Sequence, residues 1–249
     1  MRNIDDYAEK YTREPFENVM VKIRKRMIIS QCTKYDCHSM LEVGCGLSPL
    51  FMDMDHYSEM TIVEPSRHFA ENAQMLAETT KCNRAISVYN DFVENVSDAL
   101  RSEKRFDIIV VSSLLHEVEY PQKLLKSIRD LCDDTTVVHF NVPNAYSLHR
   151  LIALEMGIIS DVHDRSTQQV QMQRHSTYDM KSFEDEICDG GFEVVEKGSY
   201  FVKPFTHAQM QKGMETGIID QRILEGFEKI VKYMPEWGSE IFVNAKRKG

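Results

Sequence analysis

The chain has 249 residues, of which 42% are hydrophobic and 28% charged, and its formal net charge is -9 at pH 7. This length can bury a full hydrophobic core as one domain, with or without a small cap, and 11 glycines and 7 prolines leave little room for long disordered linkers. An acidic chain repels nucleic acid rather than gathering it, so a DNA- or RNA-binding function is disfavoured.

Apolar residues recur at helical spacing from residue 4 to about residue 30, which predicts amphipathic N-terminal helices within residues 1–35. The pattern then changes to short apolar strands that alternate with helices. We expect strands at 40–43, 60–64, 85–89, 106–112 and 135–141, and helices at 66–79 and 121–131. This alternation predicts a parallel sheet covered on both faces, formed by residues 36–144.

The alternation ends after Asn141. We expect a helix at 146–159, a polar aperiodic segment at 160–176, a helix at 180–189, strands at 192–195, 199–202 and 240–246, and one or two helices within 206–233. Long aperiodic loops inside a compact domain tend to bind ligands. We therefore expect residues 145–191 and 205–237 to form helical and loop insertions that cap an acceptor site, within a single domain spanning 1–249.

The cysteines and the apolar runs indicate the cellular compartment in which the protein resides. Six cysteines are scattered without a Cys-x-x-Cys pair, which is typical of reduced, buried thiols. The charged N-terminus does not resemble a signal peptide, and no apolar run is long enough to span a bilayer. We expect a cytoplasmic protein that does not bind membranes.

The first strand runs directly into a glycine turn at residues 44–46 (Gly-Cys-Gly). Two glycines let the backbone turn sharply and approach a ligand closely, and we expect a helix to begin at Pro49 with Ser48 as its N-cap. Glu64 ends the next strand about 20 residues later, where a carboxylate can accept both hydroxyls of a ribose. The pair predicts an adenosine-type ligand at the carboxyl ends of the strands.

Two residues beside the turn narrow the choice of ligand. Pro49 stands where a dinucleotide site has its third glycine, which disfavours pyrophosphate. Glu42 lies just before the turn, where a carboxylate would repel phosphate but suit a cationic ligand with an ammonium group. These features together predict S-adenosylmethionine.

The same residues resemble a known family. Residues 41–46 (Leu-Glu-Val-Gly-Cys-Gly) look like motif I, E/D-x-G-x-G, of the class I S-adenosylmethionine-dependent methyltransferases. Residues 62–66 resemble their second motif, and residues 106–121 resemble their fourth-strand motif with the turn after it. The likeness covers about residues 39–144 and, more weakly, residues 175–203.

Within this class the chain is similar to the ubiquinone-biosynthesis-like methyltransferases of small molecules and sugars. The resemblance implies a doubly wound, mostly parallel, seven-stranded α/β sheet of the Rossmann-like type, ending in a reversed hairpin and carrying a helical cap insertion. The family's third motif I glycine is replaced by Ser48 here.

The resemblance also implies roles for individual residues. Glu42 and the glycine turn would frame the methionine end of the cofactor, Glu64 would bind the ribose, and Asp91 with Phe92 would hold the adenine. Glu42 as a surface residue and Asp91 as a helix N-cap stay open as alternatives. The implied cofactor-binding residues are Tyr11, Glu42, Gly44, Cys45, Gly46, Glu64, Pro65, Asp91, Phe92 and Ser112.

Methyl transfer needs alignment and removal of the acceptor proton. Histidine titrates near neutrality, so His116, just after the fourth strand, and His175, in the aperiodic segment, are the candidate bases. The competing interpretations are a residue packed against the following helix for His116 and a solvated loop histidine for His175. No group of His, Cys and Asp has metal-ligand spacing, so we expect no required metal. The candidate substrate-binding residues are His149, Arg174, Tyr178 and Lys203.

The sequence thus predicts a methyltransferase that acts on a hydroxyl oxygen of a small acceptor, such as a sugar or natural-product intermediate. A homodimer is possible. Transfer to nitrogen or carbon, a nicotinamide-dependent oxidoreductase, and a non-catalytic binding module on the same fold stay open as alternatives.

Overall fold

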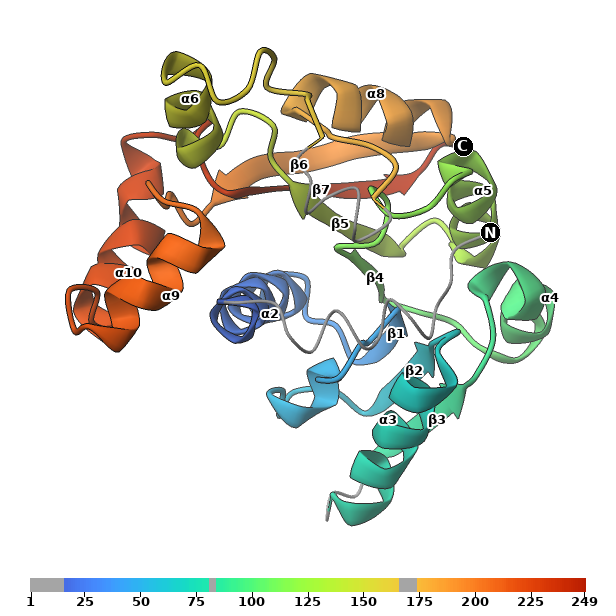
Figure 1. Ribbon diagram of the computed structural model, residues 1–249. Coiled ribbons are helices and arrows are strands. Elements are labelled where there is room, and N and C mark those ends of the chain that lie inside the picture. Colours follow the sequence, from blue (N-terminus) through green and yellow to red (C-terminus); the bar gives the residue numbers. More distant parts are fainter. Residues whose placement is uncertain (1–15, 81–83, 166–173) are drawn as a thin grey trace.

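The computed structural model describes residues 16–80, 84–165 and 174–249. Their strands form one seven-stranded sheet in the order β3-β2-β1-β4-β5-β7-β6 (Figure 1). The elements are α2 (Glu17–Lys34), β1 (Ser39–Val43), η1 (Leu50–Met52), β2 (Glu59–Val63), α3 (Arg67–Thr79), β3 (Ala85–Tyr89), α4 (Val93–Glu103), β4 (Ile108–Ser112), α5 (Pro121–Leu131), β5 (Val137–Pro143), α6 (Leu148–Glu155), α8 (Met180–Asp189), β6 (Phe192–Tyr200), α9 (His207–Glu215), α10 (Gln221–Lys229), η2 (Ile230–Lys232) and β7 (Glu240–Arg247).

Strands β1 to β5 are parallel to one another, and β7 lies antiparallel between β5 and β6. The mostly parallel sheet and its reversed hairpin are confirmed. The strand order reverses between β1 and β4, and open α/β sheets bind ligands in the crevice at the carboxyl ends of the strands on either side of such a point. The topology therefore places a binding site beyond Val43 and Ser112, where these two strands end.

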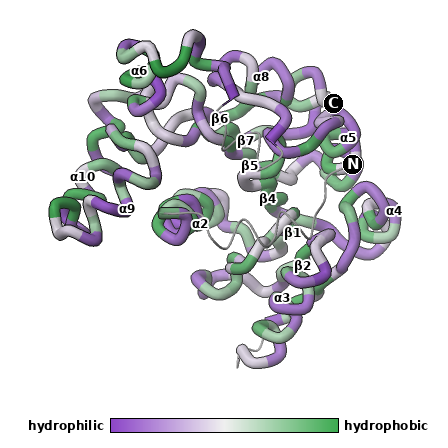
Figure 2. Tube along the Cα trace, in the orientation of Figure 1, coloured by the Kyte–Doolittle hydropathy of each residue, from purple (hydrophilic) through white to green (hydrophobic). Residues whose placement is uncertain are grey.

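The central strands are apolar on both faces because helices cover both. The side chains from Ile108 to Val111 in β4 are buried, and Figure 2 shows the central strands coloured mainly as hydrophobic. Helices α4, α5 and α8 lie on one side of the sheet and α2 on the other (Figure 1). Each fully buried large aliphatic side chain contributes about 1.5–3 kcal/mol.

Besides the hydrophobic cores on the two faces of the sheet, a third hydrophobic core joins α2 to the C-terminal helices. Phe16 and Met20 pack with Phe201 of the segment after β6 and with Leu224 of α10. The rings of Phe16 and Phe201 stack with their centroids 6.2 Å apart. This core holds α9 and α10 beside α2, so the N-terminal and C-terminal helices together flank the carboxyl edge of the sheet.

The predicted bounds of β3, α5 and α8 are confirmed without change. The helix predicted to begin at Pro49 is wrong, because only the short 3-10 turn η1 follows. Pro49 has an extended backbone (ψ 149°), so Leu50 is the first residue of that turn. The predicted helix at 146–159 is shortened to α6, and Gly157 turns into the left-handed region (φ +68°) two residues after its end.

Two further elements differ from the prediction. The strands expected at 192–195 and 199–202 are one strand, β6, whose register shifts between Val194 and Glu196. A β-bulge of this kind interrupts the alternation of side chains, which made one strand look like two. Helix α4 was not predicted, although its buried Val93 and Leu100 are seven positions apart on one helical face.

In residues 16–80, 84–165 and 174–249, no helix is long and apolar enough to cross a membrane.

Candidate active site

A cavity of about 940 Å³ opens at the carboxyl edge of the sheet. Its floor comes from the ends of β1, β2 and β4, and α2 covers one side of it. Lys203 follows β6 and Glu240 begins β7; both reach the cavity because β6 ends, and β7 begins, at the same edge where β5 ends. The site therefore draws on residues from nearly the whole length of the described chain.

Most of the predicted site residues line this cavity. Asp91 and Tyr178 do not line it, and Tyr11 lies outside the described residues. Tyr178 is buried in the hydrophobic core, where the centroid of its ring lies 5.6 Å from that of Phe183. The predicted residues that line the cavity are Glu42, Gly44, Cys45, Gly46, Glu64, Pro65, Phe92, Ser112, His116, His149, Arg174, His175 and Lys203.

The glycine turn has the backbone conformation that its sequence predicts. Gly44 (φ +79°) and Gly46 (φ +56°) both lie in the left-handed region, which an L side chain disfavours. The N–H of Gly44 donates to the carbonyl of Val63 over 2.9 Å, which ties the turn to the end of β2. The two strand ends thus form one continuous floor.

Glu64 joins the turn to the start of α3. Its Oε2 accepts a hydrogen bond from the N–H of Gly46 (3.2 Å), and its Oε1 accepts one from the N–H of Ser66 (2.8 Å). Ser66 is also the N-cap of α3. These contacts hold the carboxylate at the cavity wall in a fixed orientation.

Glu42 is a buried carboxyl group beneath the turn. Its Oε2 accepts a hydrogen bond from the N–H of Leu50 over 3.0 Å. Burial raises the pKa of Glu42 to about 7, and the Leu50 N–H and the Lys25 ammonium offset only part of that effect. The alternative of a surface strand residue is wrong, because Glu42 is 6% exposed.

Lys25 of α2 was not predicted from the sequence, yet it fixes the outer side of the turn. Its ammonium donates to Ser48 Oγ (2.8 Å), to the carbonyl of Pro49 (2.9 Å) and to Asp53 Oδ2 (2.5 Å). The charge of Lys25 is therefore matched within the protein, which indicates a structural role.

A buried polar chain lies behind Ser112 at the cavity floor. Ser112 Oγ donates to Asn141 Oδ1 (3.1 Å), Asn141 Nδ2 contacts His139 Nε2 (3.1 Å), and His139 Nδ1 contacts Asn244 Oδ1 (2.7 Å). Burial lowers the pKa of His139 to about 4. A neutral imidazole has one donor and one acceptor nitrogen, so Nδ1 donates to Asn244 and Nε2 accepts from Asn141. These polar residues stand in otherwise apolar strands, and that pattern is the sequence signal that could have located this row of hydrogen bonds.

Phe92 and Asp91 lie between the end of β3 and the start of α4. Phe92 lines the cavity and is 42% exposed, so its ring face is accessible. Asp91 Oδ1 accepts hydrogen bonds from the N–H of Phe92 (2.7 Å) and from Asn95 Nδ2 (2.6 Å). Asp91 thus orients Phe92 and Asn95, and both of these line the cavity.

The two candidate bases are linked through the backbone. The carbonyl of His116 accepts hydrogen bonds from the N–H of His175 (2.9 Å) and of Ser176 (3.1 Å). The His116 side chain is 2% exposed, with its Nε2 3.7 Å from Glu117 Oε1, whereas the His175 side chain is exposed. Both line the same cavity, one inside it and one at its rim.

A buried ion pair between α2 and the start of β7 lines another part of the cavity. Arg24 contacts both carboxylate oxygens of Glu240, with Nε 3.0 Å from Oε2 and Nη2 2.5 Å from Oε1, and Tyr200 donates to Oε2 over 2.5 Å. Burial alone would raise the pKa of Glu240, but Arg24 and Tyr200 more than offset it and hold the pKa below its usual value. Arg24 also contacts Glu17 Oε1 at 3.3 Å.

Comparison with known proteins decides the family. A family model described as a methyltransferase domain matches residues 7–197, which is more than half of the chain. The chain belongs to the class I S-adenosylmethionine-dependent methyltransferases. This membership favours the methyltransferase over the nicotinamide-dependent oxidoreductase among the predicted functions. A comparison with curated protein sequences found no match.

Solved methyltransferase structures share the fold at low sequence identity. The plantazolicin methyltransferase BamL, in complex with a triazolic desmethylPZN analog and SAH, has a TM-score of 0.61 and 15% identity over 98% of this chain and 91% of its own. An S-adenosylmethionine-dependent methyltransferase from Clostridium acetobutylicum has a TM-score of 0.56 and 11% identity over 92% of both chains. The N-methyltransferase NodS from Bradyrhizobium japonicum has a TM-score of 0.51 and 10% identity, covering 90% of this chain and 87% of its own.

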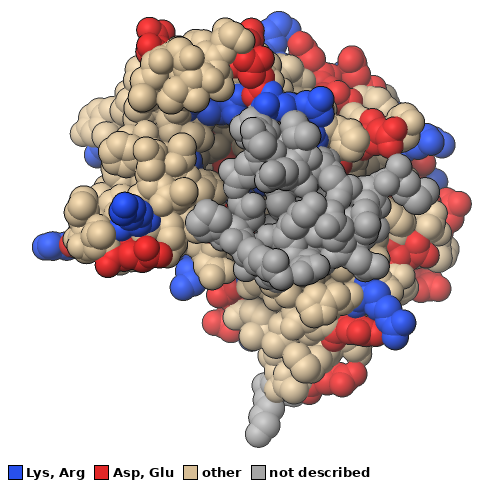
Figure 3. Space-filling model, in the orientation of Figure 1, with Lys and Arg blue, Asp and Glu red and all other residues tan. Residues whose placement is uncertain are grey.

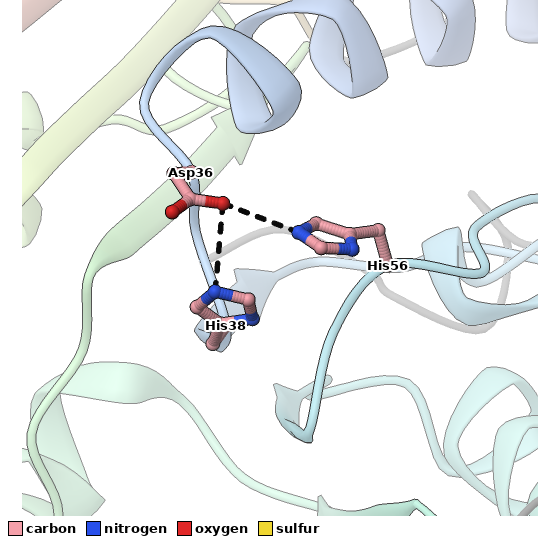
Figure 4. A group of neighbouring side chains, drawn as sticks. All are labelled: Asp36, His38 and His56. Atoms are coloured by element: carbon pink, nitrogen blue, oxygen red, sulfur yellow. Dashed lines mark hydrogen bonds and ion pairs between the residues drawn. The ribbon is translucent and has the colours of Figure 1, made fainter.

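This methyltransferase also carries a cluster of metal-ligand type far from its cavity. Asp36 Oδ1 lies 3.5 Å from His38 Nε2 and 3.2 Å from His56 Nε2, and all three side chains are exposed (Figure 4). These residues precede β1 and β2, so they lie at the amino edge of the sheet, opposite the cavity. The cluster was not predicted from the sequence because His56 is distant from the other two residues along the chain.

Proposed function

We propose that this methyltransferase transfers a methyl group to a hydroxyl oxygen of a small acceptor, such as a sugar or a natural-product intermediate. One observation carries the proposal: the glycine turn, with Glu42 and Glu64 beside it, shares a single cavity with His116 and His175. The first part has the groups to hold the cofactor. The second part has the groups to accept a proton from a hydroxyl.

The residues of the cofactor half fit S-adenosylmethionine. A carboxylate can accept about four hydrogen bonds, so Glu64 is suited to accept from ribose hydroxyls while it holds the turn. Phe92 offers an accessible ring face for the adenine, and Glu42 lies buried under the turn, near the expected position of the methionine ammonium. When bound, S-adenosylmethionine supplies a methyl group that its positive sulfur already activates.

The chain's own contribution to the reaction is alignment and proton removal. We assign His175 as the base that takes the acceptor proton, because its exposed side chain can return that proton to water. His116 is assigned a place beside the acceptor, inside the cavity. Ser112, held by Asn141, presents a neutral hydroxyl dipole at the floor and repels neither reactant.

The test is a product analysis with the full-length chain and methyl-labelled S-adenosylmethionine. A panel of nucleotide sugars and phenols is offered together with amines of matched size, and nuclear magnetic resonance locates the transferred methyl group. We expect methyl ethers, with formation strongly reduced in the His175→Ala variant. Label found solely on nitrogen or carbon would reject the oxygen assignment while leaving the family membership intact.

A further inference from the structure

Three basic side chains at one end of the cavity have little negative charge close enough to neutralise them. Lys203 follows β6, His149 lies on α6, and His207 is the first residue of α9. We propose that this end of the cavity binds an anionic oxygen group of the acceptor, a carboxylate or a phosphate ester, with Lys203 as its main contact. The inference rests on the proposed function, because it assigns the non-reacting part of that same acceptor.

Lys203 carries the argument because it is buried and poorly matched. Its side chain is 1% exposed, and its ammonium donates to the carbonyl of Phe205 over 3.1 Å. Among the described residues, no carboxylate lies within 4.0 Å of this ammonium. An ammonium has three N–H donors, and a buried charge without a counter-charge is costly. Burial accordingly lowers the pKa of Lys203 to about 7.

Glu240, the acidic residue that acts on Lys203, is already committed to other partners. Arg24 engages both of its oxygens, and the Tyr200 hydroxyl donates to one of them. Lys25 gives a useful contrast in the same cavity, since it has a carboxylate partner in Asp53 at 2.5 Å. The protein therefore supplies a counter-charge to Lys25 and leaves that of Lys203 to be supplied by a ligand.

Basic side chains lie around the two histidines. Burial lowers the pKa of His149 and of His207 well below the usual value, and nearby basic side chains add to this effect. Lys203 acts on both histidines. The other basic groups are His207 and Arg150 for His149, and Arg174 and Arg24 for His207.

Figure 3 shows Lys and Arg side chains, with Asp and Glu side chains beside them, between the α6 and α8 regions of this face. Neutral imidazoles can each donate one N–H, and an ammonium can donate three, so together they match the several lone pairs of an oxyanion. An acceptor held in this way would place its hydroxyl toward His116 and His175, which line the same cavity.

The experiment uses the full-length chain saturated with S-adenosylhomocysteine and titrated with inorganic phosphate or with malonate at constant ionic strength. Calorimetry and thermal unfolding report binding. We expect saturable binding that weakens about tenfold or more in Lys203→Met, which keeps the length of the side chain but not its charge. Lys203→Arg and the exposed α5 variant Lys126→Met should bind like the wild type. The stronger of the two probes identifies the anion class.

A second measurement needs no substitution. Acetic anhydride labelling followed by peptide mass spectrometry should modify Lys203 more slowly when phosphate or malonate is present, and Lys126 at an unchanged rate. Absence of saturable anion binding, or equal binding by wild type and Lys203→Met, would overturn the inference. S-Adenosylhomocysteine binding is measured in the same samples, so a fault in the cofactor assignment would show there, apart from the anion result.

Discussion

The N–H of Gly46 donates to Glu64 Oε2 over 3.2 Å, although the two residues are 18 positions apart in the chain. This hydrogen bond joins the glycine turn after β1 to the acid that directly follows β2. The acid proposed to hold the ribose thus also sets the conformation of the turn proposed to hold the methionine end. A change at Glu64 should affect both halves of the cofactor.

Glu64→Ala should weaken S-adenosylhomocysteine binding by about 1–3 kcal/mol, because the ribose hydroxyls and the Gly46 N–H lose their acceptor. Glu64→Gln keeps one carbonyl oxygen and should cost less. Isothermal calorimetry measures both effects, with Glu71→Ala on the exposed face of α3 as the matched control. Wild-type affinity in Glu64→Ala would remove this residue from the site.

Glu42 should make cofactor affinity depend on pH. Its carboxyl has a pKa of about 7 in the free protein, and the cofactor ammonium favours the ionised form, so binding releases a proton below pH 7. Affinity should therefore fall as the pH falls below 7, by at most about tenfold per pH unit. Calorimetry from pH 8 to pH 5.5 tests this, and Glu42→Gln should flatten the profile.

Glu42→Gln should stabilise the free protein at high pH, although it should weaken cofactor binding. The folded pKa of Glu42 lies above its ordinary value of 4.5, so its contribution to stability is fully present below pH 4.5 and is lost as the pH rises through 7. Glu42→Gln should therefore raise the unfolding midpoint of the free protein at pH 8 while it weakens cofactor binding. A variant that lost both properties would instead indicate a damaged fold.

His139 should make the fold sensitive to acid. Its folded pKa of about 4 lies below the ordinary 6.5, so the stability it contributes is present above pH 6.5 and is lost as the pH falls through 4. The loss should approach ~3 kcal/mol relative to His139→Gln, which cannot titrate. Urea unfolding of both proteins at pH 7, 5.5 and 4 measures it. Parallel pH profiles for the two proteins would contradict this reading.

His175→Ala should lower kcat by about 100-fold or more and leave S-adenosylhomocysteine affinity unchanged, because a base acts on the acceptor proton and not on the cofactor. His116→Asn should raise the acceptor KM, since this side chain is assigned a place beside the acceptor. His68→Ala, on the exposed face of α3, is the control. Turnover at the wild-type rate in His175→Ala would leave the base elsewhere.

Metal removal should not change turnover. The cluster of Asp36, His38 and His56 lies at the amino edge of the sheet, and the cavity opens at the carboxyl edge. Dialysis against EDTA, and the His38→Ala variant, should both leave the methylation rate as it was. A drop that added zinc restores would show that the cluster supports activity.

Local patterns allowed much of this fold to be predicted. The apolar run from Ile108 to Val111 and the glycine turn are each contiguous in the sequence, so the sheet and the turn could be predicted from neighbouring residues. The pairing of Arg24 with Glu240 spans 216 positions and could not. Tyr178 shows the converse: a polar-tipped residue in a polar segment is buried, because its ring packs in a core that includes residues of β5, which is distant in the sequence.

A crystal structure of the full-length chain with S-adenosylhomocysteine would show whether the cavity holds the cofactor as proposed. We expect ribose hydroxyls within hydrogen-bond distance of the Glu64 carboxylate, and the homocysteine end over the Gly44–Gly46 turn. Density for the nucleoside elsewhere, with Glu64 contacting protein groups alone, would contradict this expectation.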